Sequence, residues 1–156
     1  MWINRRELLS GLAAALPGFC SPQPSRSELR INADRLRENL EGLSVHGRPK
    51  DGTFADGVSR VAFSDADLAG RKYAMQLMGS FGMEPCIDPA GNIFGSRAGS
   101  NKNLKPILFG SHTDSVSNGG NFDGDLGSMA AIEVLHTLKE HSITTRHPLQ
   151  IVSRDE

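Results

Sequence analysis

Leucines recur at helical spacing soon after residue 30. Leu36, Leu40 and Leu43 stand four and three residues apart, an interval that places side chains on one face of an α-helix. Asn32 is suited to cap this helix, because its side chain can accept a hydrogen bond from the first free backbone N–H groups. Residues 45–61 are rich in Gly, Asp and Pro, have no periodicity, and predict a loop.

Two further helices are predicted downstream. Ser64 and Asp67 form an S-x-x-D cap at the start of the second helix, and Gly82 is placed to end it. The third helix covers residues 126–140, where apolar positions again recur at helical intervals.

Short apolar runs between these helices predict strands. Residues 84–88 and 92–97 flank the turn at 89–91 and predict a hairpin. The run at 106–110 is typical of a strand buried on both faces, and 149–152 predicts one more strand. We therefore expect an α/β domain, an open mixed sheet with flanking helices, with a polar loop at its carboxyl edge, where such sheets usually bind ligands.

Composition favours one ordinary globular domain. The 156 residues are 38% hydrophobic and 22% charged, enough to bury a single core. The net charge is -1 and no basic stripe interleaves with aromatic residues, so a nucleic-acid partner is not indicated. Cys20 and Cys86 form neither a CxxC pair nor a disulfide framework.

The segment 1–25 differs from the rest of the chain. Arg5 and Arg6 precede a mild apolar run, Leu8 to Leu16, that is too short to span a bilayer and is followed by prolines. This order resembles a twin-arginine export signal, and the alternative is an amphipathic N-terminal helix. A functional signal would make the protein periplasmic or exported and free of the membrane after its removal; otherwise the protein is expected in the cytoplasm.

His112 and Asp114 follow the apolar strand directly. Residues two apart in an extended segment point the same way, so these two side chains can converge just past the strand end. A metal-bound imidazole needs an acceptor for its other ring nitrogen, and a carboxylate can supply it. An H-x-D pair alone is weak support for a metal site.

Asp123 strengthens that reading. It arrives eleven positions after His112 in a glycine-rich loop that can bend tightly and bring it back toward the imidazole. A carboxylate so placed could bridge two divalent ions roughly 3.5–4 Å apart. The alternatives are an Asx turn or an N-cap for the third helix, and a cap role is expected for Asp125. His46, His136, His141 and His147 lack ligand spacing to His112.

Several segments resemble one family. Residues 110–116 and 118–124 strongly resemble the metal-binding block of the hydantoinase/carbamoylase branch of the M20 metallopeptidase-like family. Residues 57–64 and 88–95 look like the same branch, in the same order, so the resemblance covers 31–156.

The resemblance implies a role for each matching residue. His112 would bind one of two divalent ions (Zn, Mn, Co or Ni), Asp123 would bridge both, and Asp114 would orient His112. Glu156 aligns with the general base. A shift of one residue would make Glu156 a metal ligand and Asp155 the base.

The resemblance also implies a metal-dependent amidohydrolase that acts on small linear amides or ureido compounds, of the N-carbamoyl-L-amino acid or allantoate type. Residues 31–156 would then form the N-terminal half of a zinc-peptidase-like catalytic domain. The later ligands and the lid domain, through which full-length relatives form homodimers, have no counterpart, so we expect this chain alone to be inactive. The alternatives are an M20 peptidase and a non-catalytic half-domain.

Overall fold

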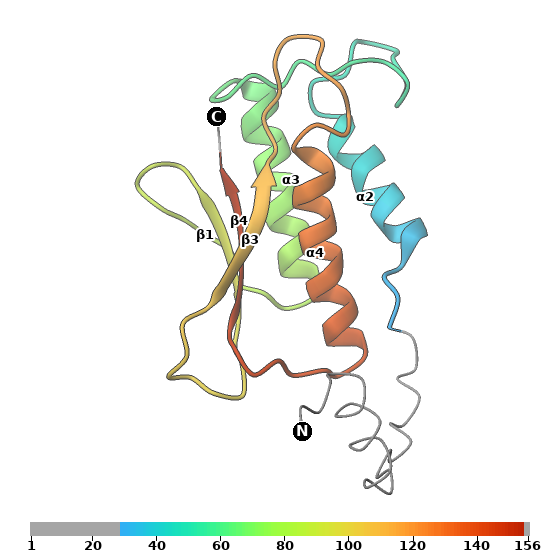
Figure 1. The fold of residues 1–156 in the computed structure, drawn as a ribbon. Helices are drawn as coiled ribbons and strands as arrows, with labels where there is room; N and C mark the ends of the chain where they lie inside the picture. Colours follow the sequence, from blue (N-terminus) through green and yellow to red (C-terminus); the bar gives the residue numbers. More distant parts are fainter. Residues whose placement is uncertain (1–28, 155–156) are drawn as a thin grey trace, which may run out of the picture.

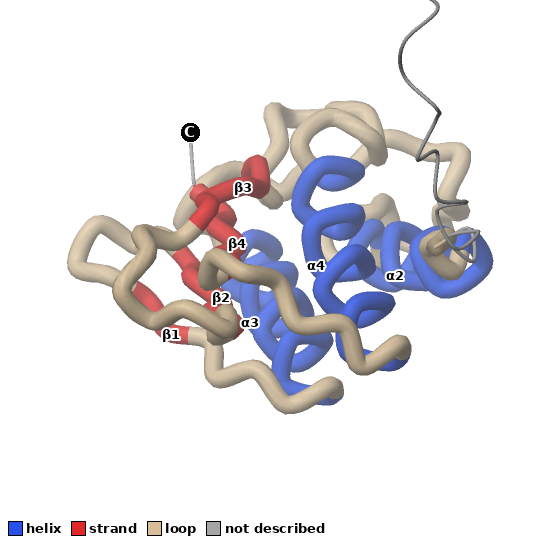
Figure 2. Tube along the Cα trace, turned by 60° about the horizontal axis from the view of Figure 1, so that its bottom comes forward, coloured by secondary structure: helices blue, strands red, loops and turns tan. Residues whose placement is uncertain are grey.

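The computed structural model of the protein describes residues 29–154, which form a four-stranded sheet with two helices packed on one face and a third helix outside them (Figures 1 and 2). The segment 1–25 expected to be an export signal lies outside the described residues, as do Asp155 and Glu156. None of the helices in the described part is long and apolar enough to cross a membrane.

The first helix, α2 (Ala33–Ser44), is capped as its sequence predicts. The Asn32 side chain accepts a hydrogen bond of 3.0 Å from the backbone N–H of Arg35. Leu43 is fully buried, and α2 packs on α4 (Asp125–Glu140) and α3 (Asp65–Ser80), with no substantial contact to the sheet. This helix therefore forms an outer layer (Figure 2).

The second helix, α3 (Asp65–Ser80), confirms both of its predicted ends. The Ser64 hydroxyl accepts a hydrogen bond from the backbone N–H of Asp67, whose carboxylate accepts one from Phe63. Gly82 follows the helix with a φ of 80°, a left-handed conformation typical of a helix stop.

The described strands are β1 (Cys86–Ile87), β2 (Ile93–Arg97), β3 (Ile107–His112) and β4 (Leu149–Arg154). Their order in the sheet is β1-β2-β4-β3; β1, β2 and β4 pair antiparallel, whereas β3 and β4 are parallel and joined through α4. The predicted open mixed sheet is confirmed. Because β3 and β4 are parallel, their carboxyl ends meet at one edge, with His112 opposite Arg154.

The core lies between the sheet and the helices α3 and α4. Its fully buried members include Met78 from α3, Ile93 and Ile151 from the sheet, and Met129 and Leu135 from α4. These contacts fix α4 across β3 and β4, so that its N-terminus lies at the sheet's carboxyl edge (Figure 1).

Strand β3 departs from its sequence prediction. Its apolar run predicts burial on both faces, but Ile107 and Leu108 are 51% and 54% exposed. Phe109 packs against the core, so its neighbour Leu108 points to the opposite face, which no described helix covers. The prediction is wrong for these residues because β3 is an edge strand of the described sheet, with helices on one side only.

Candidate metal centre

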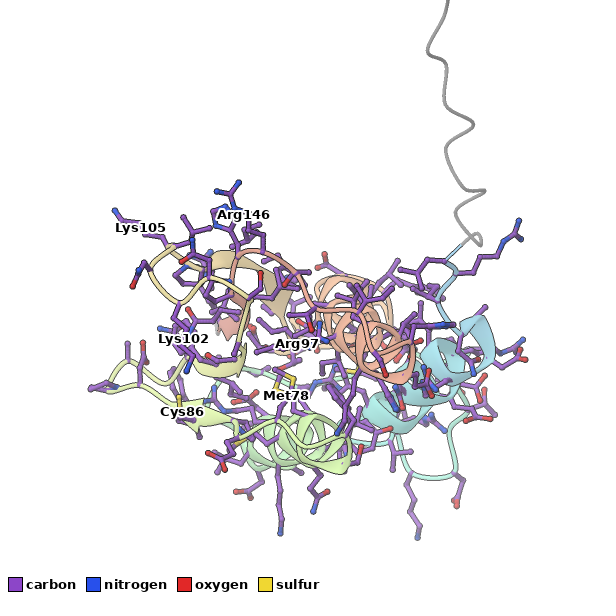
Figure 3. The ribbon with its side chains drawn as sticks, turned by 90° about the horizontal axis from the view of Figure 1, so that it is seen from below. Met78, Cys86, Arg97, Lys102, Lys105 and Arg146 are labelled. Atoms are coloured by element: carbon purple, nitrogen blue, oxygen red, sulfur yellow. The ribbon has the colours of Figure 1, made fainter. Side chains whose placement is uncertain are left out.

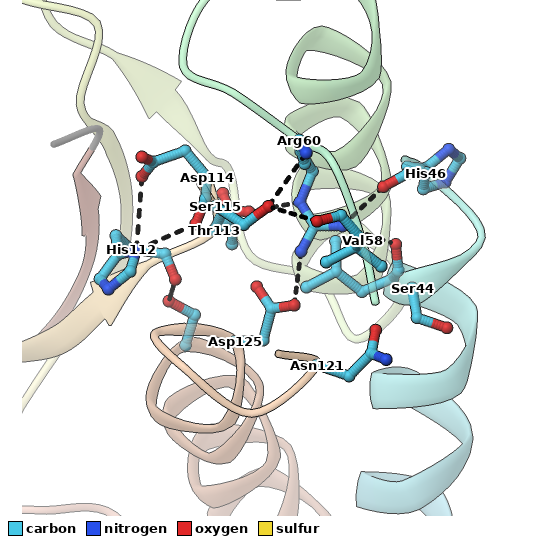
Figure 4. Close-up of polar contacts among 12 residues, drawn as sticks. Ser44, His46, Val58, Arg60, His112, Thr113, Asp114, Ser115, Asn121 and Asp125 are labelled. Carbon is cyan, nitrogen blue, oxygen red and sulfur yellow. Dashed lines mark hydrogen bonds and ion pairs between the residues drawn. The ribbon is translucent and has the colours of Figure 1, made fainter. Parts of the chain in front are cut away.

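Two of the predicted site residues, His112 and Asp114, lie at the carboxyl edge of the sheet (Figure 4). His112 is the last residue of β3 and is half-buried, and Asp114 is buried two residues beyond it. Asp123 is exposed on the loop that leads into α4. Glu156 lies outside the described residues.

The convergence of His112 and Asp114 is confirmed. The Nδ1 atom of His112 lies 3.1 Å from the Asp114 carbonyl oxygen and 3.4 Å from Asp114 Oδ1. Ser128, in the first turn of α4, donates a hydrogen bond of 2.9 Å to the His112 carbonyl oxygen. With its proton on Nδ1, the imidazole keeps the Nε2 lone pair for a ligand, the arrangement that a metal-binding histidine needs.

Gly124 brings the Asp123 loop against the imidazole. Its φ is 67°, and a Cβ at this position would lie 2.4 Å from His112 Cε1 and 2.5 Å from both ring nitrogens. Any side chain at residue 124 would therefore displace the ring and strain the backbone. The residue next to Asp123 thus packs directly on His112.

The donor set fits a divalent ion in kind but is small. Imidazole nitrogen and carboxylate oxygen are ligands that zinc, manganese, cobalt and nickel accept. Within residues 29–154, however, no group of three or more His, Cys, Asp or Glu side chains could hold a metal. The described residues supply two predicted ligands, His112 and Asp123.

Asp125 has a different role from the one expected. The N-cap of α4 is Gly124, with no side-chain cap bond, so neither Asp123 nor Asp125 caps the helix. The side chain of Asp125 is instead buried against Arg60, which donates to its Oδ2 atom. Burial raises the pKa of Asp125 to about 6, although the charge of Arg60 and its hydrogen bond oppose this shift. Charge type and position along the chain gave no sign that Arg60 would be buried beneath the site.

The other described histidines take no part in this arrangement. His136 stacks on Phe81 with ring centroids 4.6 Å apart, and His147 Nδ1 contacts the Lys105 carbonyl oxygen. Burial, together with the nearby charge of Arg60, lowers the pKa of His46.

The two ends of the sheet differ in the side chains they present. A hollow of about 450 Å³ opens beside His112, lined among others by Phe94, Leu108 and Val152. At the opposite end, three cationic side chains are exposed: Lys102, Lys105 and Arg146 (Figure 3).

The known proteins that this chain resembles in sequence include several amidohydrolases. The chain is 37% identical over 123 residues to the N-carbamoyl-L-amino acid amidohydrolase of Geobacillus stearothermophilus, covering 79% of this chain and 29% of the relative. It is 34% identical over 118 residues to the allantoate amidohydrolase of Bacillus subtilis, covering 76% of this chain and 28% of that protein. No family model matches the chain.

Solved structures agree with these relatives. A crystal structure of a hydantoinase/carbamoylase family amidase from Burkholderia ambifaria has a TM-score of 0.75 and 38% sequence identity, over 80% of this chain and 30% of that one. The chain therefore spans slightly less than a third of the length of the proteins it matches.

Proposed function

Since the chain is homologous to part of the hydantoinase/carbamoylase family amidases, we propose that it carries part of a metal-dependent amidohydrolase site for linear amides or ureido compounds. The names of the relatives favour substrates of the N-carbamoyl-L-amino acid or allantoate type. The observation that carries the proposal is the arrangement of His112, which is oriented by Asp114 and packed on Gly124, the residue after Asp123.

In this proposal each site residue has a separate role. His112 Nε2 and the Asp123 carboxylate hold the metal, and Asp114 keeps the imidazole in the required orientation. Divalent ions bound there would supply a Lewis acid that polarises the scissile carbonyl and acidifies water. Glu156 takes the proton from the attacking water, or, with the alignment shifted by one residue, is a ligand while Asp155 is the base.

Metal binding by the 156-residue chain tests the proposal. Isothermal titration with Zn²⁺, Mn²⁺, Co²⁺ and Ni²⁺ should detect binding of at least one ion. His112→Ala and Asp123→Asn should each weaken it by more than the ~10–100-fold that loss of an outer-shell partner causes. His141→Ala is the matched control, because His141 is an exposed histidine at the far end of α4. Equal binding by His112→Ala and His141→Ala would contradict the proposal.

Turnover distinguishes the substrate classes. The metal-loaded chain should be offered an N-carbamoyl-L-amino acid, allantoate and a dipeptide, with the amine or ammonia product measured. Hydrolysis of the dipeptide alone would favour the peptidase alternative. Metal binding without turnover is the expected result, because the described residues provide two ligands and a binuclear site needs more. A stable fold that binds none of the four ions would favour a non-catalytic domain.

A further inference from the structure

We propose that Arg60 is a positioning residue that holds the two ligand-bearing segments, 112–114 and 123–125, in one fixed arrangement. The inference rests on the metal site proposed above for its functional meaning. Its structural content, that one guanidinium couples two loops far apart in sequence, stands on the contacts of Arg60 alone.

The Arg60 side chain contacts both segments at once (Figure 4). Its Nε donates to the carbonyl oxygen of Thr113, the residue between His112 and Asp114, and its Nη2 donates to Asp125 Oδ2. The guanidinium therefore bridges the end of β3 and the start of α4 without touching either predicted ligand.

The same guanidinium is anchored to the outer helix layer. Its Nη1 donates to the carbonyl oxygens of Leu43 at 3.2 Å and His46 at 2.6 Å. One rigid planar group thus joins three segments through four acceptors. A lysine, with a single ammonium, cannot reproduce that geometry.

The backbone of Arg60 strengthens its hold on the first segment. Its N–H donates to Ser115 Oγ at 2.9 Å, and its carbonyl accepts from the Ser115 N–H at 2.8 Å. Side chain and backbone of one residue therefore both fix residues 113–115.

The Arg60 side chain is fully buried, in space that Gly70 leaves free. Arg60 is 0% exposed, and a Cβ on Gly70 of α3 would lie 2.7 Å from Arg60 Cδ. Asp125 Oδ1 has no hydrogen-bond partner, so the ion pair is poorly satisfied. A buried pair of this kind is weak support for stability, because apolar residues of similar volume often replace such pairs without loss. The pair lies between the two ligand-bearing segments, so we attribute it to the positioning of these segments.

Paired variants with a matched control test the proposal. Arg60→Lys and Asp125→Asn each weaken the link between the segments while keeping a polar side chain. Arg35→Lys is the control, because Arg35 also binds a buried carboxylate of α4, Glu133, but away from the site. Co²⁺ alone is the probe, with its affinity and visible spectrum recorded, together with NMR signals of the His112 ring and Gly124 amide in the metal-free protein.

The expected result is ~10–100-fold weaker Co²⁺ binding by both site variants, as for loss of an outer-shell partner, with Arg35→Lys unchanged. The His112 and Gly124 signals should shift together in both variants before metal is added. Unchanged affinity and unchanged signals in folded Arg60→Lys and Asp125→Asn would overturn the proposal. If the wild-type chain binds no Co²⁺, the metal-free NMR signals alone decide the role of Arg60. The proposed function fails only if none of the four ions binds.

Hydrogen exchange on the unaltered protein covers the case in which the variants do not fold. The amide of Ser115 bonds to the Arg60 carbonyl, and the amide of Ser128 bonds to the Gly124 carbonyl in α4. If Arg60 couples the two segments, these amides should exchange through one common opening with matching protection. Protection factors that differ by more than about tenfold would mean that the segments open separately, and would overturn the coupling.

Discussion

Two arginines connect α4 to the rest of the protein, and they do so in opposite ways. Arg60 and Asp125 are 0% and 2% exposed and lie beneath the candidate site. Arg35 of α2 is 20% exposed and binds two carboxylates of α4, Glu133 at 0% and Glu140 at 46% exposure. The first pair is sealed from water, whereas the second reaches the surface.

The carboxylates differ in how well they are satisfied. Glu133 accepts from the Asn32 N–H, from two nitrogens of Arg35 and from the Thr137 hydroxyl. Burial pushes the pKa of Glu133 upward, but these hydrogen bonds outweigh burial and hold it below its usual value. Asp125 receives only the Arg60 bond in the contacts described, and its pKa is raised to about 6. The Arg35 cluster therefore stabilises the helix packing, while the Arg60 pair is better explained by the geometry it imposes.

The largest expected effect comes from removing the sealed cation. Arg60→Met should lower the free energy of unfolding by ~3–5 kcal/mol, because Asp125 would remain buried without its partner and three carbonyl oxygens would lose a donor. Urea denaturation at pH 7 measures the change. The double variant Arg60→Met with Asp125→Leu should recover a large part of it. No recovery would mean that the lost carbonyl contacts, rather than the unpaired charge, dominate.

The second variant removes the charge of Glu133, whose carboxylate accepts hydrogen bonds from Arg35 and Asn32. Glu133→Gln should cost ~1–3 kcal/mol, because the amide NH2 would face donors from Arg35 and Asn32 and leave buried groups unpaired. Urea denaturation again measures the loss. Glu140→Gln, at the exposed end of the same cluster, serves as its control and should change the urea midpoint much less. Equal losses would show that the buried carboxylate has no special weight.

The third prediction concerns pH, because the pKa of Asp125 is raised whereas the pKa of Glu133 is lowered. The raised pKa of Asp125 means that ionisation is disfavoured in the folded state, so its contribution to stability is complete below pH 3.8 and is lost as pH rises through about 6. Lowering the pH from 7 to 5 should therefore add ~1 kcal/mol through this group. The lowered pKa of Glu133 gives stability that is present above pH 4.5 and lost as pH falls below it.

Equilibrium unfolding at pH 7, 6 and 5 checks this prediction. Asp125→Asn should remove the gain between pH 7 and 5, and Glu133→Gln should leave that gain in place. The lowered pKa of His46 removes stability over the same pH range in the wild type and in Asp125→Asn alike, so the test is the difference between these two proteins. The same change in stability from pH 7 to 5 in both would contradict the assigned direction for Asp125.

The sequence predicts local structure well because the signals for it are local. Caps at Asn32 and Ser64, the stop at Gly82 and the convergence of His112 with Asp114 each depend on residues a few positions apart. Each was confirmed by the structure.

Features that depend on distant partners were missed or wrong. The burial of β3 was overestimated because an apolar run does not tell which side of a sheet the helices cover. Asp125 looked like a cap because its partner, Arg60, is 65 residues away in sequence. The sequence indicates that Gly124 allows a tight bend, but it does not indicate that the His112 ring packs against this residue. Long-range pairing of this kind is set by tertiary packing, which periodicity does not record.

The smallest effect is expected for a surface ion pair, which differs from the ion pairs of Arg60 and Arg35 in its exposure to water. Arg37 donates to Glu41 at 2.9 Å within one turn of α2, and the two side chains are 78% and 43% exposed. Water and salt screen such a pair, and ordering two long side chains opposes its attraction. Arg37→Ala should therefore leave the urea midpoint nearly unchanged and should leave Co²⁺ binding unaffected. A loss comparable to that of Arg60→Met would mean that burial does not control the strength of these pairs, and would remove the basis for contrasting Arg60 with Arg35.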